Sequence, residues 1–342
     1  MLRRIAHSGA IVLVSLAGSV ANAQDSDLVA AAEAEGKLVW YTTVNVRQFV
    51  RPMVEAFENR YKITVEFVSG GSRDVATRLT NEAQAGKVYG DVWDGSTAFS
   101  TLGPAGLAEP YKVAAWADFP EALKDKEGRW TAQYIQVITA AVNTDLVPAA
   151  DIPKTYEDLL DPKWKGKMAW NADGGPTSPE GFIGNILISM GEEKGMGYLR
   201  KLADQDVANV AANQRAILDQ TINGEYAISI LTENHHASIS AAKGAPVKWV
   251  PIEPAIMSFS RVGIVKGAPH PNAAKLFLEF LLSEEGQAIY READYLPANP
   301  KVAAKEPGLR PGAGGFTANV ISLETYTENK EKWAGIYKEL FE

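Results

Sequence analysis

Residues 38–43 (LVWYTT) form a run of apolar and β-branched side chains, a pattern typical of a buried strand. Apolar residues at helical spacing follow over 49–57, and a second strand-like run (ITVEFV) comes at 63–68. Paired glycines then precede a helical stretch expected over 72–85, before a short third strand at 91–93. Strands that alternate with helices in this way predict βαβ units and a mostly parallel sheet, so we expect an α/β protein.

The same alternation continues through the rest of the chain, without an internal repeat or a flexible linker. Strand patterns recur at 135–142 and 255–265, and a long helix is expected over 272–291. A chain of 342 residues suits two packed domains. Because no linker separates them, we expect the chain to cross between the domains on the extended segments 135–142 and 255–265. The predicted division is 1–23 as a signal peptide, 24–135 plus 256–300 as domain 1, and 136–255 plus 301–342 as domain 2.

The composition excludes several classes of protein. The chain has 34 Lys and Arg against 42 Asp and Glu, a net charge of -8 and a pI of about 5.3, so nucleic acid and anionic membrane surfaces are not expected as partners. It has no cysteine, which excludes disulfide scaffolds, thiolate metal sites and cysteine nucleophiles. The signatures G-x-S-x-G and H-E-x-x-H are also absent from the sequence. Isolated carboxylates cannot be paired from sequence, so an exported enzyme stays open as an alternative.

The first residues have the features of a secretory signal peptide. Arg3 and Arg4 form a positive region before a short apolar run at 10–20. Ala21 and Ala23 then place small residues where an A-x-A cleavage site needs them. We therefore expect cleavage before Gln24 and a periplasmic protein. With no cysteine after the apolar run, a lipoprotein anchor is not expected.

Three motifs resemble one known family. They are the segment 155–167 (TYEDLLDPKWKGK), the run 223–225 (NGE) before a strand, and 295–300 (YLPANP) after the long helix. Together they resemble the ferric-type periplasmic solute-binding proteins of ABC importers, over nearly the whole mature chain. The resemblance implies a type II periplasmic-binding-protein fold, whose two α/β domains are joined by extended crossover strands that form a hinge. It also implies a receptor rather than an enzyme, with a ligand cleft between the domains and an inner-membrane ABC permease as partner. We expect a monomer without a cofactor.

The ligand does not follow from this resemblance. Ferric members bind the ion through two adjacent tyrosines, and the matching positions here hold His235 and His236. The family's first-domain histidine and glutamate positions fall near Asn45 and Ser96. Fe(III) prefers anionic oxygens such as phenolate, whereas imidazole suits borderline divalent metals. These replacements argue against ferric binding of the usual kind, although a bound phosphate or carbonate could still supply oxygens.

Two predicted helix starts could attract an anion. Gly71, Ser72 and Arg73 follow the second strand, where free backbone N–H groups and an arginine would face the ligand. The alternative is a turn with a serine cap and a solvated arginine. Thr177 and Ser178 precede Pro179 in the same way, and in the family the matching Thr-Ser pair helps to bind an anion. For Thr177 and Ser178 the alternative is that they form the turn and the N-cap of the helix without contacting a ligand. We expect the two starts to form an anion clamp from opposite domains.

Several further residues are candidate ligand contacts. Asn213 and Asn234 fall near asparagines that, in the family, also help to bind the anion. His235 and His236 could bind a metal, contact an anionic oxygen or simply pack, and we expect polar contact with an organic solute. Since only His270 remains in the mature chain, a three-histidine zinc site is not expected, and any metal would use the histidine pair. Arg215 and Arg261 could each pair with an anion or with nearby acids.

Three aromatic residues fall in segments that we expect at the cleft. Trp93 ends the third strand, where open parallel sheets place ligands. Tyr41 and Tyr295 lie in segments that border the cleft in the family. For each of them, burial in the core is the competing interpretation, because large aromatic side chains dominate buried area.

The leading hypothesis is a receptor that captures a small organic anion, carboxylated or phosphorylated, for import. A ferric or divalent metal receptor is the second hypothesis, and an exported enzyme is the third. Turnover of a candidate solute would separate the third from the other two.

Overall fold

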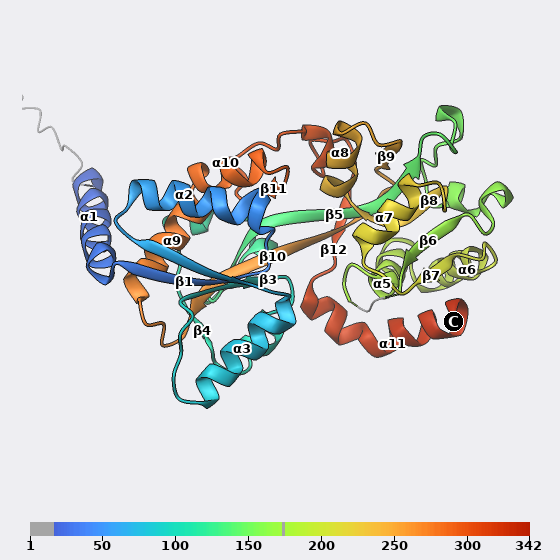
Figure 1. The fold of residues 1–342 in the computed structure, drawn as a ribbon. Coiled ribbons are helices and arrows are strands. Elements are labelled where there is room, and N and C mark those ends of the chain that lie inside the picture. Colours follow the sequence, from blue (N-terminus) through green and yellow to red (C-terminus); the bar gives the residue numbers. More distant parts are fainter. Residues whose placement is uncertain (1–16, 173–174) are drawn as a thin grey trace, which may run out of the picture.

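The computed structural model describes residues 17–172 and 175–342 as two lobes joined by long strands (Figure 1). The first lobe is built on three parallel strands, β1 (Lys37–Thr42), β2 (Thr64–Ser69) and β3 (Val92–Gly95), with β1 between the other two. The predicted strands at 38–43, 63–68 and 91–93 correspond to these three. β1 and β3 are largely buried, whereas the edge strand β2 has only Val65 buried.

Two strands run from one lobe to the other. β5 (Thr131–Asn143) and β10 (Ala255–Val265) are antiparallel, and β10 also pairs with β3 of the first lobe. β5 pairs at its far end with β8 (Ile228–Glu233), which is parallel to β6 (Met168–Asn171). The two predicted crossover segments are therefore the strands that connect the lobes.

The sheet order is β2-β1-β3-β10-β5-β8-β6-β7, so one continuous sheet passes through both lobes. Four shorter strands lie off this path: β11 (Leu296–Pro297) and β9 (Val247–Val250) on β5, and β4 (Ala108–Glu109) and β12 (Ala318–Val320) on β10. The last strand of the path is β7 (Ala208–Val210). The helices are α1 (Ala17–Glu35), α2 (Arg51–Arg60), α3 (Ser72–Gln84), α4 (Phe99–Leu102), α5 (Pro179–Met190), α6 (Glu192–Ala203), α7 (Gln214–Ile222), α8 (Asn234–Ala242), α9 (Pro271–Leu282), α10 (Glu284–Glu292) and α11 (Leu323–Phe341).

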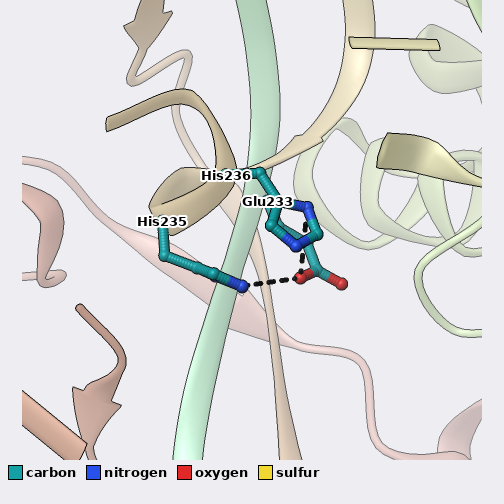
Figure 2. A group of neighbouring side chains, drawn as sticks. All are labelled: Glu233, His235 and His236. Carbon is teal, nitrogen blue, oxygen red and sulfur yellow. Dashed lines mark ion pairs between the residues drawn. The ribbon is translucent and has the colours of Figure 1, made fainter. Parts of the chain in front are cut away.

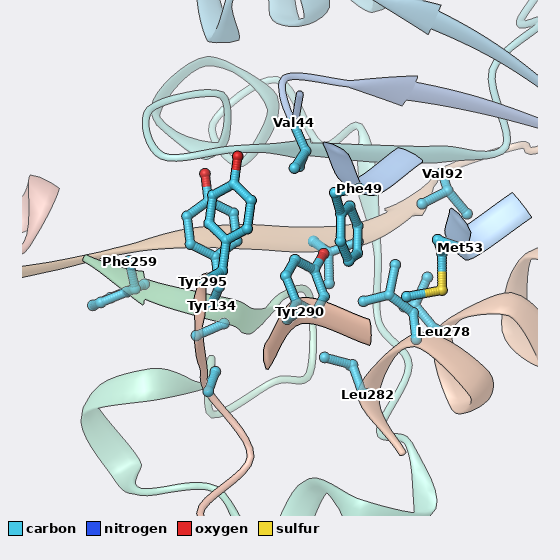
Figure 3. Packing of buried hydrophobic residues seen from close by; sticks show 14 of the residues in the cluster. Val44, Phe49, Met53, Val92, Tyr134, Phe259, Leu278, Leu282, Tyr290 and Tyr295 are labelled. Atoms are coloured by element: carbon cyan, nitrogen blue, oxygen red, sulfur yellow. The ribbon is translucent and has the colours of Figure 1, made fainter. Parts of the chain in front are cut away.

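Each lobe has its own group of buried apolar side chains. In the first lobe Phe49 stacks on Tyr290, with ring centroids 3.7 Å apart, and Met53 and Leu278 lie beside them (Figure 3). The second lobe packs around Trp170, which is fully buried. Burying one apolar side chain of this size stabilises the fold by about 1.5–3 kcal/mol. Each lobe therefore has a substantial core. The exact domain boundaries at 135, 256 and 300 stay a prediction.

Helix α11 fastens the C-terminus to the second lobe (Figure 1, red). Asn209 accepts a hydrogen bond from Trp170 Nε1 at 2.5 Å and another from the Tyr337 hydroxyl at 2.8 Å. Beneath the helix, a Cβ added at Gly184 would come 2.4 Å from the Trp333 ring. The small glycine therefore lets α11 lie close against α5.

The single long helix predicted over 272–291 is wrong, because the chain breaks it into α9 and α10. Ser283 lies between them in an extended conformation, and its hydroxyl accepts a hydrogen bond from the Gly286 backbone N–H at 3.1 Å. A serine that caps a new helix offers the backbone an alternative to continuing the old one.

The predicted signal peptide lies mostly outside the described residues, since 1–16 are not among them. The described part begins with α1, which includes the predicted cleavage position after Ala23. No helix in the described part of the chain combines the length and the apolar character needed to cross a membrane.

Candidate functional site

The topology directs several helix starts toward the space between the lobes. In the first lobe, α3 begins where β2 ends. In the second lobe, α5 follows β6 and α8 follows β8. β3 is antiparallel to β10 and β8 is antiparallel to β5, so the strands that precede α3, α5 and α8 run from each lobe toward the other. A helix N-terminus carries unpaired N–H groups and a partial positive charge, which favours polar or anionic ligands there.

The central polar cluster comes from the junction of β8 and α8. We call Glu233, His235 and His236 the histidine group (Figure 2). His235 Nε2 lies 3.3 Å from a Glu233 carboxylate oxygen, and His236 Nδ1 lies 3.8 Å from the same oxygen. The two imidazole rings are 4.2 Å apart. Glu233 is the last residue of the largely buried strand β8, and helix α8, which starts next, carries both histidines close to it.

Aromatic and amide side chains surround this group. The Tyr295 ring lies 5.0 Å from His235, and the Tyr134 ring lies 4.8 Å from Tyr295. Gln136 Nε2 donates a hydrogen bond to Glu233 at 3.0 Å. The backbone of Asn45 is within hydrogen-bonding reach of the Tyr295 hydroxyl. Residues that follow β1 and α10 therefore meet residues that follow β8.

Burial favours the uncharged forms of the side chains in the histidine group. It raises the pKa of Glu233 to about 7, and the hydrogen bond from Gln136 only partly offsets this. Burial, with Arg215 nearby, lowers the pKa of His236 to about 4. For His235, burial and the neighbouring imidazole hold the pKa well below its usual range. Burial also raises the pKa of Tyr295 to about 12. At neutral pH the histidine group thus presents two uncharged imidazoles and a Glu233 carboxyl that is protonated in part, with the Tyr295 phenol beside them.

The spacing of the histidine group also fits a metal ion. Its three ligand atoms all lie within 4.8 Å of one another. Bonds of about 2.0–2.2 Å in a tetrahedral zinc site place neighbouring ligand atoms about 3.3–3.6 Å apart. The 3.3 and 3.8 Å distances to Glu233 are close to those separations, and the buried His236 Nδ1 has no hydrogen-bond partner among the described residues. Neutral imidazole is the form that binds metals.

The structure brings only some of the predicted ligand residues together. Asn45, His235, His236 and Tyr295 lie in one group, as described above. Sequence reasoning missed Glu233, although it lies immediately before Asn234. Its importance depends on burial, which a single acidic residue at the end of a strand does not reveal.

Tyr41 and Trp93 are predicted cleft contacts that the structure assigns to the interior. The Tyr41 hydroxyl donates to Glu82 at 2.6 Å, near the far end of α3 from its start, and Arg78 covers the ring. Trp93 is fully buried, and its Nε1 donates to the Ile264 carbonyl at 3.3 Å. Both side chains are buried, and the polar atom of each has an internal hydrogen-bond partner, which favours the core interpretation.

The start of α3 is only partly as predicted. Gly71 is the N-cap residue, and its N–H donates to the Asp74 carboxylate at 3.0 Å, so an acidic group already occupies this start. Arg73 is exposed. Ser72 lies against the end of β3, since a Cβ added at Gly95 would come 2.6 Å from its hydroxyl. These contacts weaken the case for an anion at α3.

The start of α5 has the predicted cap but a different hydrogen bond. Ser178 is the N-cap and Pro179 follows it, yet the Ser178 hydroxyl donates backward to the Gly175 carbonyl at 2.6 Å. Ser178 is also buried, so its hydroxyl stabilises the turn rather than facing a ligand. Thr177 stays available at the surface of a small cavity between the lobes.

The two predicted asparagine contacts differ in accessibility. Asn213 is exposed and caps α7, accepting from the Ala216 N–H at 2.9 Å. Asn234 is fully buried and donates a hydrogen bond to the Leu309 carbonyl at 3.1 Å, so its amide links the start of α8 to the segment around Leu309. Ser96 lines the same cavity as Thr177, and Arg261 lines it too.

Comparison with known proteins identifies the family. A family described as bacterial extracellular solute-binding protein matches residues 52–311, which is more than half of the chain. The chain is also similar to an uncharacterized protein of Haemophilus influenzae, with 26% identity over 311 residues and 87% of each chain covered.

Two solved structures share the fold. A periplasmic binding protein from Actinobacillus pleuropneumoniae, with fructose-6-phosphate bound, matches with a TM-score of 0.70 and 23% identity, covering 90% of this chain and 98% of the other. Iron-bound HitA from Pseudomonas aeruginosa matches with a TM-score of 0.70 and 22% identity, covering 89% and 99%. The predicted α/β periplasmic-binding-protein fold is confirmed. The chain belongs to the bacterial extracellular solute-binding proteins of the iron(III) type, a family of periplasmic, non-enzymatic receptors of ABC importers.

Proposed function

We propose that this receptor captures a small organic anion, carboxylated or phosphorylated, between its lobes and delivers it to an inner-membrane ABC permease. The observation that carries this proposal is the largely buried histidine group, with its uncharged imidazoles and Tyr295 beside them, where His235 and His236 stand at positions at which ferric relatives are expected to hold a tyrosine pair. Such groups donate hydrogen bonds to carboxylate, phosphate or hydroxyl oxygens. The fructose-6-phosphate bound by the structural neighbour from Actinobacillus is a ligand of this class.

Hydrogen bonding by Glu233 fits an anionic solute as long as the carboxyl holds its proton. With its pKa raised to about 7 by burial, the carboxyl can donate to an anionic oxygen at mildly acidic and neutral pH. His235 and His236 can each donate one ring N–H in their neutral forms. The titratable groups that face Glu233 are these two histidines, Tyr134 and Tyr295.

A divalent cation such as Zn²⁺ is the second candidate ligand. The spacing of Glu233, His235 and His236 supports it, because the two imidazole nitrogens lie 3.3 and 3.8 Å from a Glu233 oxygen, close to the separations in a zinc site with open positions. The same donor set disfavours Fe(III), which prefers phenolate and other anionic oxygens. Iron binding by the structural neighbour from Pseudomonas is therefore a poor guide to the ligand of this chain.

The two candidates respond to pH in opposite directions. Anion affinity should fall as the pH rises through about 7, where Glu233 loses its proton and becomes a like charge. Metal affinity should rise over the same range, because metal ligands must be deprotonated. Native mass spectrometry of the purified protein would first identify any retained solute. Calorimetry with that solute and with Zn²⁺, on stripped protein at about pH 6 and about pH 8, then decides between the candidates.

The variant Glu233→Gln sharpens this test. Glutamine keeps the shape and the ability to donate a hydrogen bond but cannot supply an anionic metal ligand. An anion receptor should bind its solute at least as well at high pH after the change, and a metal receptor should lose most of its affinity. Glu328→Gln, an exposed acid on α11, is the control for a general change of charge. Loss of organic-solute binding at every pH in Glu233→Gln, with Zn²⁺ binding intact, would contradict both assignments.

We also propose that residues 1–23 are removed on export to the periplasm. N-terminal sequencing of the exported protein should begin at Gln24. A mature chain that still carries Arg3 and Arg4 would contradict this.

A further inference from the structure

An ion pair crosses the seam between the lobes. Arg261 lies on the crossover strand β10, and one of its terminal nitrogens is 3.1 Å from the carboxylate of Glu324, in the first turn of α11. Helix α11 runs from the middle of the molecule along the second lobe, where it packs on α5 and α6 (Figure 1). Beside the pair, residues 96–97 of the first lobe and 175–177 of the second line one small cavity, so the two lobes approach each other here.

The Arg261 side chain is fixed by the first lobe. Its backbone pairs with Gly95 of β3. Its flat guanidinium packs over the rings of Trp130 and Phe259, and its other terminal nitrogen donates to the Ser96 carbonyl. The side chain is only 2% exposed. These partners all belong to the first lobe or to β10 itself, so they can hold the guanidinium in place when the lobes separate.

Glu324 is attached to the second lobe through α11. Ser322 caps this helix and accepts a hydrogen bond from the Thr325 N–H at 3.1 Å. Two residues beyond Glu324, the Tyr326 hydroxyl donates to the Glu180 carboxylate in the first turn of α5. The Glu324 side chain is 54% exposed, so water can solvate its carboxylate when the lobes separate.

The ion pair also spans an irregularity in β10. Residues 255–257 of this strand pair with β12, which leads into α11, whereas 261–264 pair with β3 of the first lobe. Between these two parts, the register of β10 against β5 shifts at Ser260 and Arg261. An irregularity of this kind bends a strand locally, so we expect β10 to bend there when the lobes move. Such bending changes the distance between Arg261 and Glu324.

We propose that Arg261 and Glu324 form a clasp that favours the closed lobes and so raises the affinity for the solute that the receptor carries. Among the described residues, Glu324 is the only carboxylate within ion-pairing distance of Arg261, and Arg261 Nε has no hydrogen-bond partner. Opening therefore leaves a buried charge without an anionic partner, which is unfavourable. The apparent affinity of a receptor falls with the fraction of molecules in the binding-competent state. Both are positioning residues, and the clasp does not depend on which solute the histidine group binds.

The experiment measures the populations of closed and open lobes in the mature protein, stripped of solute. The chain has no cysteine, so Glu55→Cys on α2 and Lys201→Cys on α6, both exposed, provide one spin-labelling site on each lobe. Electron–electron double resonance between the two labels reports both populations. Glu324→Gln should lower the closed-to-open ratio by about threefold or more, because a neutral amide is a weaker partner for the guanidinium. The control Glu328→Gln, exposed on the same helix, should leave the ratio unchanged.

A salt titration separates charge pairing from other effects of the variant. Raising NaCl from about 20 mM to about 1 M screens a half-exposed ion pair, so the ratio should fall in the wild type and stay nearly constant in Glu324→Gln. A lower melting temperature of Glu324→Gln with an unchanged ratio would overturn the proposal, because the pair would then support only α11. Equal responses of Glu324→Gln and Glu328→Gln, or a wild type found only with open lobes, would also overturn it. Since no solute is present, an incorrect assignment of the solute would leave these results unchanged.

Discussion

Glu233→Gln should change how stability depends on pH. Burial raises the pKa of Glu233 from 4.5 to about 7, so the folded protein holds a proton that the unfolded chain has already released. For a raised pKa, the contribution to stability is complete below the unfolded value and is lost as the pH rises through the folded one. One pKa unit corresponds to about 1.4 kcal/mol, so this carboxyl should remove about 2–3 kcal/mol between about pH 5 and about pH 8. Glutamine does not titrate and should abolish that loss.

Urea unfolding of solute-free wild type and variant at several pH values measures this effect. The histidines work in the opposite direction, since their lowered pKa values remove stability as the pH falls below 6.5. The informative quantity is therefore the variant's stability minus that of the wild type at each pH. It should increase by about 2–3 kcal/mol from about pH 5 to about pH 8, whereas the Glu328→Gln difference should stay flat. A Glu233→Gln difference that does not vary with pH would refute the buried, neutral state of the histidine group.

Three further changes test the packing and the movement of the lobes. Ser283→Ala should lower the stability by about 1 kcal/mol, because α10 loses its N-cap, and urea unfolding that finds no loss would contradict the described helix break. Asn209→Ala should lower the free energy of unfolding by about 2–4 kcal/mol, because Trp170 Nε1 and the Tyr337 hydroxyl lose their acceptor. An unchanged melting temperature would argue against these hydrogen bonds holding α11 to the second lobe. Adding the retained solute should reduce the radius of gyration in small-angle scattering, as the lobes close on the hinge strands; an unchanged radius at saturation would argue against closure.

The order of the strands and helices could be predicted from the sequence because the buried runs are long and apolar. The strands expected at 38–43 and 63–68, for example, each differ by one residue from β1 and β2. Predictions failed where a polar side chain redirects the backbone. The apolar pattern continues across Ser283, so periodicity alone predicts one helix where the serine hydroxyl starts a second. β5 begins at Thr131 rather than 135, because Gln133 is buried in the strand with its amide bonded to Ser260.

The candidate site was harder to predict because it depends on side-chain direction and burial. His235 and His236 were noticeable as a pair, whereas Glu233 gains its role from enclosure by residues that are distant in sequence, Gln136 among them. Tyr41 and Trp93 have the expected positions in their strands, but their polar atoms turn toward internal partners. No local pattern contains that information, since it depends on what packs on each face of the sheet.

The most direct test of the account is a crystal structure of the protein with the solute that it retains on purification. The account predicts an organic anion between the lobes, with oxygens in hydrogen-bonding distance of His235, His236 and Glu233, and Tyr295 beside it. A metal ion coordinated by the same three side chains would establish the second candidate instead. A solute bound away from the histidine group, with Glu233 still hydrogen-bonded only to Gln136, would contradict the central claim.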